Sequence, residues 1–282
     1  MTHPLLDSHV HLWDPHRLRY PWLERHPALD RPFGPGELDA ATAVPVGVIV
    51  VEAGREPEQA AAEVAWVREL ARSRPEIRGM VAHLSLERGP SAHGEIPRLA
   101  EDPFVLGVRR LIQDEPPGFT ADPQLRAGVA LLGEAGLPFD ACVREHQLTQ
   151  LDGLVAACPQ TVIVLDHLGK PEPAGFEDGR WYRALRRLAD RPNVVCKLSG
   201  LATQSPGSAG PRELRAFLRA AIELFGPHRC LFGSDWPVLT LNTEYGGWLD
   251  LVRSALTGCS AEETAAVLGG NAARIYRVPS HH

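Results

Sequence analysis

Short apolar segments rich in β-branched residues alternate along the chain with longer segments in which apolar residues recur every three or four positions. The first pattern is typical of buried strands and the second of amphipathic helices. Eight segments fit a strand: Leu5–Leu12, Val46–Val51, Ile77–Leu84, Val105–Ile112, Pro138–Val143, Thr161–Leu165, Val194–Leu198 and Cys230–Gly233. Seven fit a helix: Pro57–Ser73, Pro123–Ala135, Gln147–Ala157, Gly179–Asp190, Pro211–Phe225, Tyr245–Leu256 and Ala261–Leu268. Strands that alternate with helices predict a parallel sheet with helical crossovers.

A closed barrel and an open doubly wound sheet both fit this alternation, and the turn after the first strand separates them. It reads His-Val-His-Leu-Trp-Asp-Pro and lacks the glycine-rich phosphate loop of dinucleotide-binding sheets. The 282 residues also match one barrel, which typically needs ~250. We therefore predict a single-domain α/β protein, a (β/α)8 TIM-like barrel over residues 1–282. A long loop over residues 13–43 and a Ser/Gly-rich rim loop over Thr203–Gly210 would shape its mouth.

Composition narrows the classes of partner. The 35 acidic residues outnumber the 29 basic ones, and no Lys/Arg run is present that would neutralise successive phosphates, so we expect no nucleic-acid partner. The sequence contains no run of ~18 apolar residues, so we expect no membrane span. We also expect no signal peptide, because His, Asp and Pro interrupt the first residues. Five widely spaced cysteines without a CxxC pair predict neither a disulfide framework nor a zinc knuckle. We expect a cytoplasmic protein. The sequence does not decide its oligomeric state, and a homo-oligomer remains one of the alternatives.

A His-x-His pair ends the first predicted strand, in the motif DSHVH at residues 7–11. Side chains two positions apart on a strand point to the same side, so the imidazoles of His9 and His11 converge. At the C-terminal mouth of a barrel they are placed to bind one divalent metal ion or to hold a substrate oxygen. Such a pair taken alone is more often structural, but its position at a strand end favours a functional site.

The sixth predicted strand also ends in polar residues, in VIVLDHLGKP at residues 162–171. Catalytic side chains of barrel enzymes occupy the C-terminal ends of the strands, so His167 is a candidate catalytic residue and third metal ligand. The alternative is a histidine that caps the following turn. Strand alternation would direct Asp166 away from His167, to brace a neighbouring strand or loop.

The last predicted strand gives CLFGSDWP at residues 230–237. Asp235 follows the apolar positions and is the candidate general base, because a carboxylate beside histidines can take a proton from water. We expect partial burial to raise its pKa towards the working range. Asp235 is also a candidate metal ligand, and its alternative role is an N-cap for the next helix.

The fourth predicted strand supplies two adjacent arginines, of which alternation allows only one to face inward. An inward Arg109 would stabilise negative charge on a substrate carbonyl and serve in catalysis. An outward guanidinium would instead pair with a helix carboxylate. Further candidate substrate-binding residues lie on strand ends and loops: Glu52, Arg110, Asp140, Arg144, Trp22 and Trp236. For Glu52, a structural hydrogen bond is an equal alternative, and tryptophans pack in cores more often than they stack on sugars.

Four ordered motifs carry a family resemblance: DSHVHLWDP, VLDHLGKP, VVCKLSGL and FGSDWPV. With them the chain resembles, essentially end to end, the amidohydrolase-related group of sugar lactonases that act on L-fucono- and L-rhamnonolactone. It is more distantly similar to 2-pyrone-4,6-dicarboxylate lactonase. The resemblance implies an amidohydrolase-type barrel that opens a small lactone, with His9, His11, His167 and Asp235 in the active site and Asp235 activating the water.

The resemblance also bears on the cofactor and on the substrate contacts. It implies one divalent metal ion, with zinc as the first candidate. Some lactonases of this group do not need the metal. A lysine-bridged pair of metals is not expected, because Lys170 and Lys197 are the only lysines and neither lies on the fourth predicted strand. Arg109 matches the arginine of the family pattern, whereas Arg110 stands where related lactonases often have histidine, which puts the substrate contacts in doubt.

Three other functions remain open at this point. A pyrone-dicarboxylate lactonase would need two separated cationic pockets for its substrate. A zinc-dependent decarboxylase of the same superfamily shares the histidines and the aspartate, but would release carbon dioxide. A non-catalytic binding barrel would be expected to lack one of these residues, and this chain has all of them. We therefore expect the site to bind a small-molecule lactone as its substrate, with a sugar lactone as the first candidate.

Overall fold

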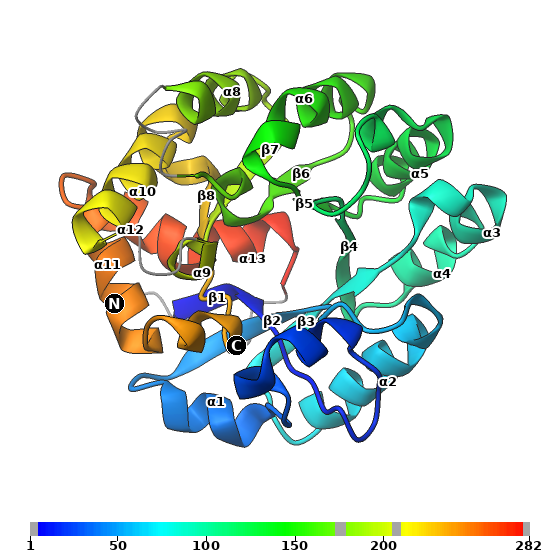
Figure 1. The fold of residues 1–282 in the computed structure, drawn as a ribbon, viewed down its shortest axis with the longest axis horizontal. Helices are drawn as coiled ribbons and strands as arrows, with labels where there is room; N and C mark the ends of the chain where they lie inside the picture. Colours follow the sequence, from blue (N-terminus) through cyan, green and yellow to red (C-terminus); the bar gives the residue numbers. More distant parts are fainter. Residues whose placement is uncertain (1–4, 173–178, 205–209, 279–282) are drawn as a thin grey trace.

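The computed structural model describes residues 5–172, 179–204 and 210–278, in which eight parallel strands form one sheet in chain order. The helices surround the strands in the view down the barrel (Figure 1). Contacts between the first and last strands close the sheet: the Ser8 hydroxyl donates to the Phe232 carbonyl, and Val10 bridges to Trp236. The strands are β1 Leu5–Val10, β2 Val46–Val51, β3 Ile77–His83, β4 Val105–Leu111, β5 Phe139–Cys142, β6 Ile163–Leu165, β7 Val194–Leu198 and β8 Cys230–Phe232.

The α-helices cover the outer face of this barrel because each presents an apolar stripe to the strands. In α10, for example, Phe217, Leu218, Ala221 and Phe225 are buried at spacings of three and four. The described helices are α1 Pro35–Ala41, α2 Ala60–Ala71, α3 Pro90–His93, α4 Ile96–Glu101, α5 Pro123–Glu134, α6 Leu148–Ala157, α8 Arg180–Ala189, α9 Leu201–Gln204, α10 Pro211–Phe225, α11 Tyr245–Ala255, α12 Ala261–Ala265 and α13 Asn271–Ile275.

A separate apolar cluster fills the inside of the barrel at the N-terminal ends of the strands. Inward side chains of the strands pack there against Ala272 and Tyr276, at the end of the chain. Figure 1 shows α13 crossing this end of the barrel, and α13 contacts β1 and β8. The interior is therefore an apolar packed core at one end, with buried polar side chains above it towards the other end.

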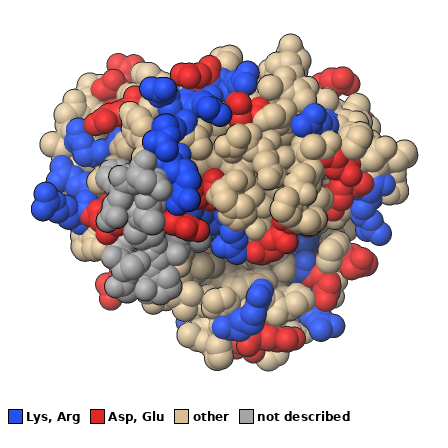
Figure 2. Space-filling model, turned by 45° about the horizontal axis from the view of Figure 1, so that its top comes forward, with Lys and Arg blue, Asp and Glu red and all other residues tan. Residues whose placement is uncertain are grey.

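The eight predicted strands and the barrel are confirmed. The loop expected over residues 13–43 is only partly a loop, because it contains α1 and two short 3-10 helices, Pro21–Arg25 and Pro27–Leu29. The short helices α3 and α4 were not predicted. Most of the expected rim loop, residues 205–209, lies outside the described residues. Within the described part of the chain, no helix has the length and apolar character needed to cross a bilayer. Basic and acidic side chains are interspersed on the face shown in Figure 2.

Candidate active site

A cavity of about 520 Å³ opens at the C-terminal ends of the strands. Its floor is formed by His11, Arg109, His167 and Asp235. Its walls come from the loop after β1 and the loops after β4, β5 and β6: Trp22, Arg25, His26, Gln113, Asp114, Arg144 and Lys170. The cavity thus has the size of a small-molecule site and the position that barrel enzymes use for catalysis.

His9 in β1 and His11 directly after it face the cavity end of the barrel because the strand is irregular. Its register with β2 shifts between Asp7 and Val10, so Leu6 still faces the lower core while His9 and His11 face the cavity end. The backbone N–H groups of His9 and Ser234 donate to the buried Asp7 carboxylate, which ties β1 to the segment after β8. The imidazole Nε2 atoms of His9 and His11 lie 3.1 Å apart.

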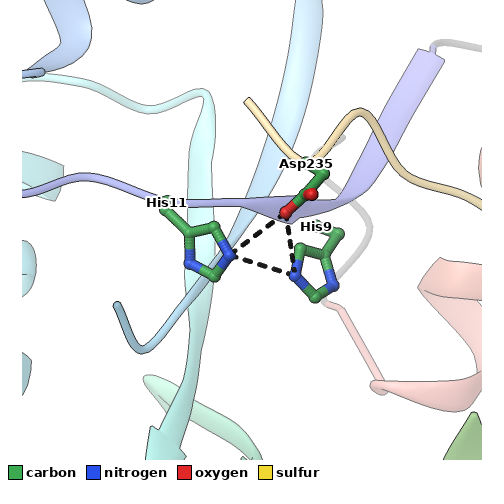
Figure 3. Close-up of side chains that lie close together, drawn as sticks. All are labelled: His9, His11 and Asp235. Atoms are coloured by element: carbon green, nitrogen blue, oxygen red, sulfur yellow. Dashed lines mark hydrogen bonds and ion pairs between the residues drawn. The ribbon is translucent and has the colours of Figure 1, made fainter. Parts of the chain in front are cut away.

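Three histidines turn the same ring nitrogen towards Asp235. Asp235 Oδ1 lies 3.7 Å from His9 Nε2, 3.4 Å from His11 Nε2 and 4.0 Å from His167 Nε2. Figure 3 shows His9 and His11 converging on this carboxylate. All four side chains are buried or nearly so. The residues expected at the catalytic centre therefore lie together, at the base of the cavity.

Each of these histidines is held by a partner at its other ring nitrogen. His11 Nδ1 donates to the Val51 carbonyl at 2.8 Å, and His167 Nδ1 is hydrogen-bonded to Ser199 Oγ at 2.9 Å. His9 Nδ1 lies 3.3 Å from Asp166 Oδ1 and 3.1 Å from Lys197 Nζ. These contacts fix the ring orientations, as partners of ligand histidines do in metal sites.

A left-handed stretch of backbone places His167. The φ angles of His167, Leu168 and Lys170 are 53°, 54° and 52°, and Gly169 between them has φ 72°. This conformation ends β6 abruptly and turns His167 into the cavity, so the alternative of a simple turn cap does not describe it. Gly200 leaves room for the ring, since a Cβ there would lie 2.3 Å from His167 Nδ1.

Asp235 lies in the segment between β8 and the next helix. Its backbone is left-handed, with φ 64°, and its N–H donates to the His9 carbonyl at 2.8 Å. The helix that follows begins at Val238 with Pro237 in the N-cap position, so Asp235 does not cap it. Its side chain points instead to the histidines.

The buried charges shift the acid–base properties of these groups. Burial would raise the pKa of Asp235, but His167 and the bond with His11 outweigh it and hold this pKa below its ordinary value. The expectation of a raised pKa for Asp235 is therefore wrong, because the neighbouring histidines stabilise the carboxylate form. Burial lowers the pKa of His167 to about 4 and that of His9 well below its ordinary value. These two imidazoles are neutral at pH 7 and can act as ligands.

Arg109 faces the inside of the barrel, as predicted for the fourth strand. Its Nε donates to Glu52 Oε1 at 2.8 Å and its Nη2 to the Glu52 carbonyl at 2.6 Å, which leaves Nη1 at the edge of the cavity. Nη1 lies 3.5 Å from Asp166 Oδ2. Glu52 was expected to bind substrate, and that prediction is wrong: its side chain is fully buried and holds Arg109, which is the structural alternative.

A buried network lies directly beneath His9. The Lys197 ammonium donates to Asp140 and lies 3.2 Å from Asp166 Oδ1, and the Tyr276 hydroxyl donates to Asp140 at 2.8 Å. The prediction that Asp140 binds substrate is therefore wrong, because this carboxylate is below the cavity floor and is used by Lys197 and Tyr276. The prediction that Asp166 faces away from His167 is also wrong. The left-handed backbone breaks the strand alternation, so both side chains enter the barrel.

Two further candidates for substrate contact do not reach the cavity. Arg110 points outward and pairs with Glu87 and Glu115, which is the alternative stated for the outward arginine. Trp236 is 2% exposed and packs edge-to-face on Phe33. Both predictions are wrong because neighbouring protein groups occupy these side chains.

Two others do line the cavity. The Trp22 indole N–H donates to the Ala53 carbonyl at 2.8 Å, and the ring stands beside His26. Across the cavity, Arg144 pairs with Asp114 at 2.7 Å. Trp22 and Arg144 thus remain candidates for contact with substrate.

Sequence reasoning missed the supporting residues of the site. Asp166, Ser199 and Gly200 each act through His9 or His167, and Asp7 acts through the backbone of β1. A signal for two of them was present, because Ser199 and Gly200 follow the seventh strand directly, at the same mouth. The seventh strand also carries Lys197 among apolar residues, but the identity of its partners depends on tertiary contacts.

The donor set fits a single metal ion. In tetrahedral zinc sites, bonds of ~2.0–2.2 Å place ligand atoms ~3.3–3.6 Å apart. His9 Nε2, His11 Nε2 and Asp235 Oδ1 are separated by 3.1, 3.4 and 3.7 Å, close to these values. Two imidazoles and a carboxylate are also ligands that zinc accepts in proteins. The side chains of this site are therefore arranged as ligands of one divalent cation.

Comparisons with known proteins agree with this site. The family model described as Amidohydrolase matches residues 6–278. L-fucono-1,5-lactonase of Burkholderia multivorans is 36% identical over 294 residues, which cover 97% of this chain and 96% of that protein. L-fucono-1,5-lactonase of Burkholderia ambifaria is 30% identical over 282 residues, 97% of this chain and 95% of that protein. A crystal structure of an amidohydrolase from Burkholderia multivorans with bound zinc is 36% identical, with a TM-score of 0.87, and covers 98% of this chain and 100% of that chain. The resemblance seen in the motifs is confirmed, and this chain belongs to the amidohydrolase family.

Proposed function

We propose that this protein is a lactonase that opens a small sugar lactone to its hydroxy acid, with Asp235 as the base that activates water. The observation that carries the proposal is the convergence of His9, His11 and His167 on the Asp235 carboxylate at the floor of a cavity of small-molecule size. The two Burkholderia relatives named L-fucono-1,5-lactonase support lactone hydrolysis. A sugar lactone fits a cavity that offers both an indole ring and charged hydrogen-bond donors.

We propose zinc as the metal of this site, held by His9, His11 and Asp235 with His167 beside them. A zinc ion there would supply a Lewis acid for the lactone carbonyl. The zinc-bound amidohydrolase of similar structure supports this choice. Asp166 supports the site because its Oδ1 lies 3.3 Å from His9 Nδ1. With Nδ1–H directed at Asp166, His9 presents the Nε2 lone pair to the cavity.

The side chains then divide the chemistry between them. Asp235, ionised at neutral pH, takes a proton from water, and the resulting hydroxide attacks the lactone carbonyl carbon. Arg109, held by Glu52, places Nη1 where it stabilises negative charge on the carbonyl oxygen in the tetrahedral intermediate. The bond to the ring oxygen breaks, and the protonated Asp235 returns its proton to that oxygen. The product is the open hydroxy acid.

Trp22 and Arg144 are proposed to bind the sugar from opposite walls of the cavity. The indole ring offers a flat apolar surface for the ring C–H groups, and the guanidinium offers N–H donors for hydroxyls. All five cysteines are free thiols, which fits the reducing environment of the cytoplasm. We therefore propose that the reaction takes place in the cytoplasm, as part of carbohydrate breakdown.

Acid release from a panel of five- and six-membered aldonolactones, followed with a pH indicator, tests the proposal. The panel is run with metal-stripped protein and with protein resupplied with zinc. We expect rapid proton release on at least one sugar lactone, faster with zinc. No acid release on any lactone, with or without zinc, would overturn the proposed function, and release of carbon dioxide from aromatic carboxylic acids would assign a decarboxylase instead.

A further inference from the structure

Lys170 lies at the end of the left-handed stretch that also holds His167. Its φ and ψ are 52° and 65°, a conformation that side chains with a Cβ rarely adopt. It also precedes Pro171, and a residue before proline is normally driven to extended backbone. Glycine or asparagine would occupy this position at lower cost. A lysine in this conformation costs conformational free energy, which indicates that its side chain has a function.

The surroundings hold the turn in place. Leu168 is fully buried, its carbonyl accepts a hydrogen bond from Trp181 Nε1 at 2.9 Å, and a Cβ on Gly169 would lie 2.4 Å from Leu148 Cδ2. In a left-handed turn of this kind, residues three apart lie on the same side, as they do in a right-handed helix. His167 and Lys170 are three apart, and both line the cavity.

The ammonium of Lys170 has donors to spare. It donates to the Gln113 side-chain oxygen, and within the described residues it forms no ion pair with a carboxylate. An ammonium has three N–H groups, so two have no partner among the described residues and can donate to another acceptor. Two other cations that line the cavity each pair with a carboxylate, Arg109 with Glu52 and Arg144 with Asp114.

Gln113 fixes the position of the ammonium. Its Nε2 donates to Asp114 at 3.0 Å, and Arg144 Nε donates to its backbone carbonyl at 3.1 Å. The side chains from the loops after β4, β5 and β6 therefore form one connected polar wall. Lys170 is half-buried in this wall, next to the floor that carries His167 and Asp235.

We propose that Lys170 is a substrate-binding residue that determines specificity by donating a hydrogen bond from Nζ to a ring hydroxyl of the lactone. The inference rests on the proposed lactonase function and adds the residue that recognises a ring hydroxyl of the lactone. A preset donor of this kind rejects an analogue that lacks the hydroxyl, since the ammonium then loses its second partner while remaining partly desolvated. Lys170 thus acts in binding, while the bond-breaking steps remain with Asp235.

Three proteins test this inference: Lys170→Met, which keeps the length of the side chain, Lys170→Asn, which suits left-handed backbone, and Arg219→Met as control. Arg219 is on α10, pairs with exposed Glu223 and gives the same change of charge away from the cavity. KM and kcat are measured on a hydroxylated lactone and on singly deoxygenated analogues. Zinc content and the melting temperature are measured in parallel.

We expect both Lys170 variants to lower kcat/KM on the hydroxylated lactone by about 10- to 100-fold, the range for a hydrogen bond to a charged group, mainly through KM. For the analogue that lacks the contacted hydroxyl, the loss should disappear, while zinc content and the control stay at the native level. The Asn variant should fold at least as stably as the native protein. An equal loss on every analogue, or no change in KM, would overturn the role of Lys170 while lactone turnover by the native protein stands. Failure of the native protein on every lactone would overturn the function and this inference together.

Discussion

Lys197 is a fully buried lysine between two buried carboxylates, and its replacement by methionine is the sharpest test of the interior. Its ammonium contacts Asp140, Asp166 and His9 Nδ1. Methionine keeps most of the volume but removes the charge, which leaves Asp140 without a cation and Asp166 with Arg109 at 3.5 Å. Removing one partner of a buried pair costs ~3–5 kcal/mol, because the remaining charge is buried and uncompensated.

For a protein of this size, 1 kcal/mol corresponds to ~2–4 °C, so Lys197→Met should lower the melting temperature by roughly 6–20 °C. Burial already raises the pKa of Asp140 to about 6, against the opposing effect of Lys197. Without the lysine this carboxyl would become protonated more readily. The destabilisation should therefore be smaller at pH 5 than at pH 8, because the ionised form that carries the penalty is less populated at low pH.

Urea unfolding at both pH values measures the free energy of unfolding of the variant and of the native protein. Arg219→Met is the control, because it removes one positive charge from an exposed ion pair. In a second variant, Asp140→Asn is added to Lys197→Met. The double variant should recover more than half of the lost free energy, since Tyr276 can still donate to the amide oxygen. A loss below ~1 kcal/mol for Lys197→Met, or an Asp140→Asn change that adds to the loss, would refute the reasoning.

Three further changes probe other parts of the site. Gly200→Ala should lower kcat/KM more than ~10-fold, because its Cβ would lie 2.3 Å from His167 Nδ1; unaltered kinetics would contradict the assigned ring position. Burial raises the pKa of Asp7 to about 6, above the ~3.9 of an unfolded chain, so its stabilising contribution is present below about pH 4 and is lost as the pH rises through 6. The stability of the native protein relative to Asp7→Asn should then fall by up to ~3 kcal/mol between pH 4 and pH 7, and parallel pH curves in urea unfolding would argue against this. Zinc titrated into metal-free protein should bind with one equivalent, and His11→Ala should weaken binding at least ~10-fold; native affinity in that variant would remove His11 from the site.

The barrel was predictable because its signals are local. Each buried strand is a short apolar segment, and polar residues at the ends of strands one, six and eight identified His9, His11, His167 and Asp235. These four side chains do lie together. Their convergence follows from the geometry of parallel strands, whose carboxyl ends share one face of the barrel.

The errors arose where tertiary contacts override the local pattern. Strict alternation assigned Asp166 to the wrong side, since a left-handed turn follows it directly. Glu52 directly follows β2 and Asp140 lies in β5, positions that resemble substrate contacts, but each carboxylate is bound by a buried cation from another strand. Partners that lie 57 residues apart in the chain leave no mark in a local sequence window.

The central claim is that Asp235 activates water for attack on a lactone, and the most direct measurement is kcat/KM of Asp235→Asn on the best sugar lactone of the panel. The variant is assayed with excess zinc, and its zinc content and melting temperature are recorded. Loss of a general base predicts a fall of about 10²- to 10⁴-fold in a folded, zinc-containing protein. Native kcat/KM in that protein would contradict the account.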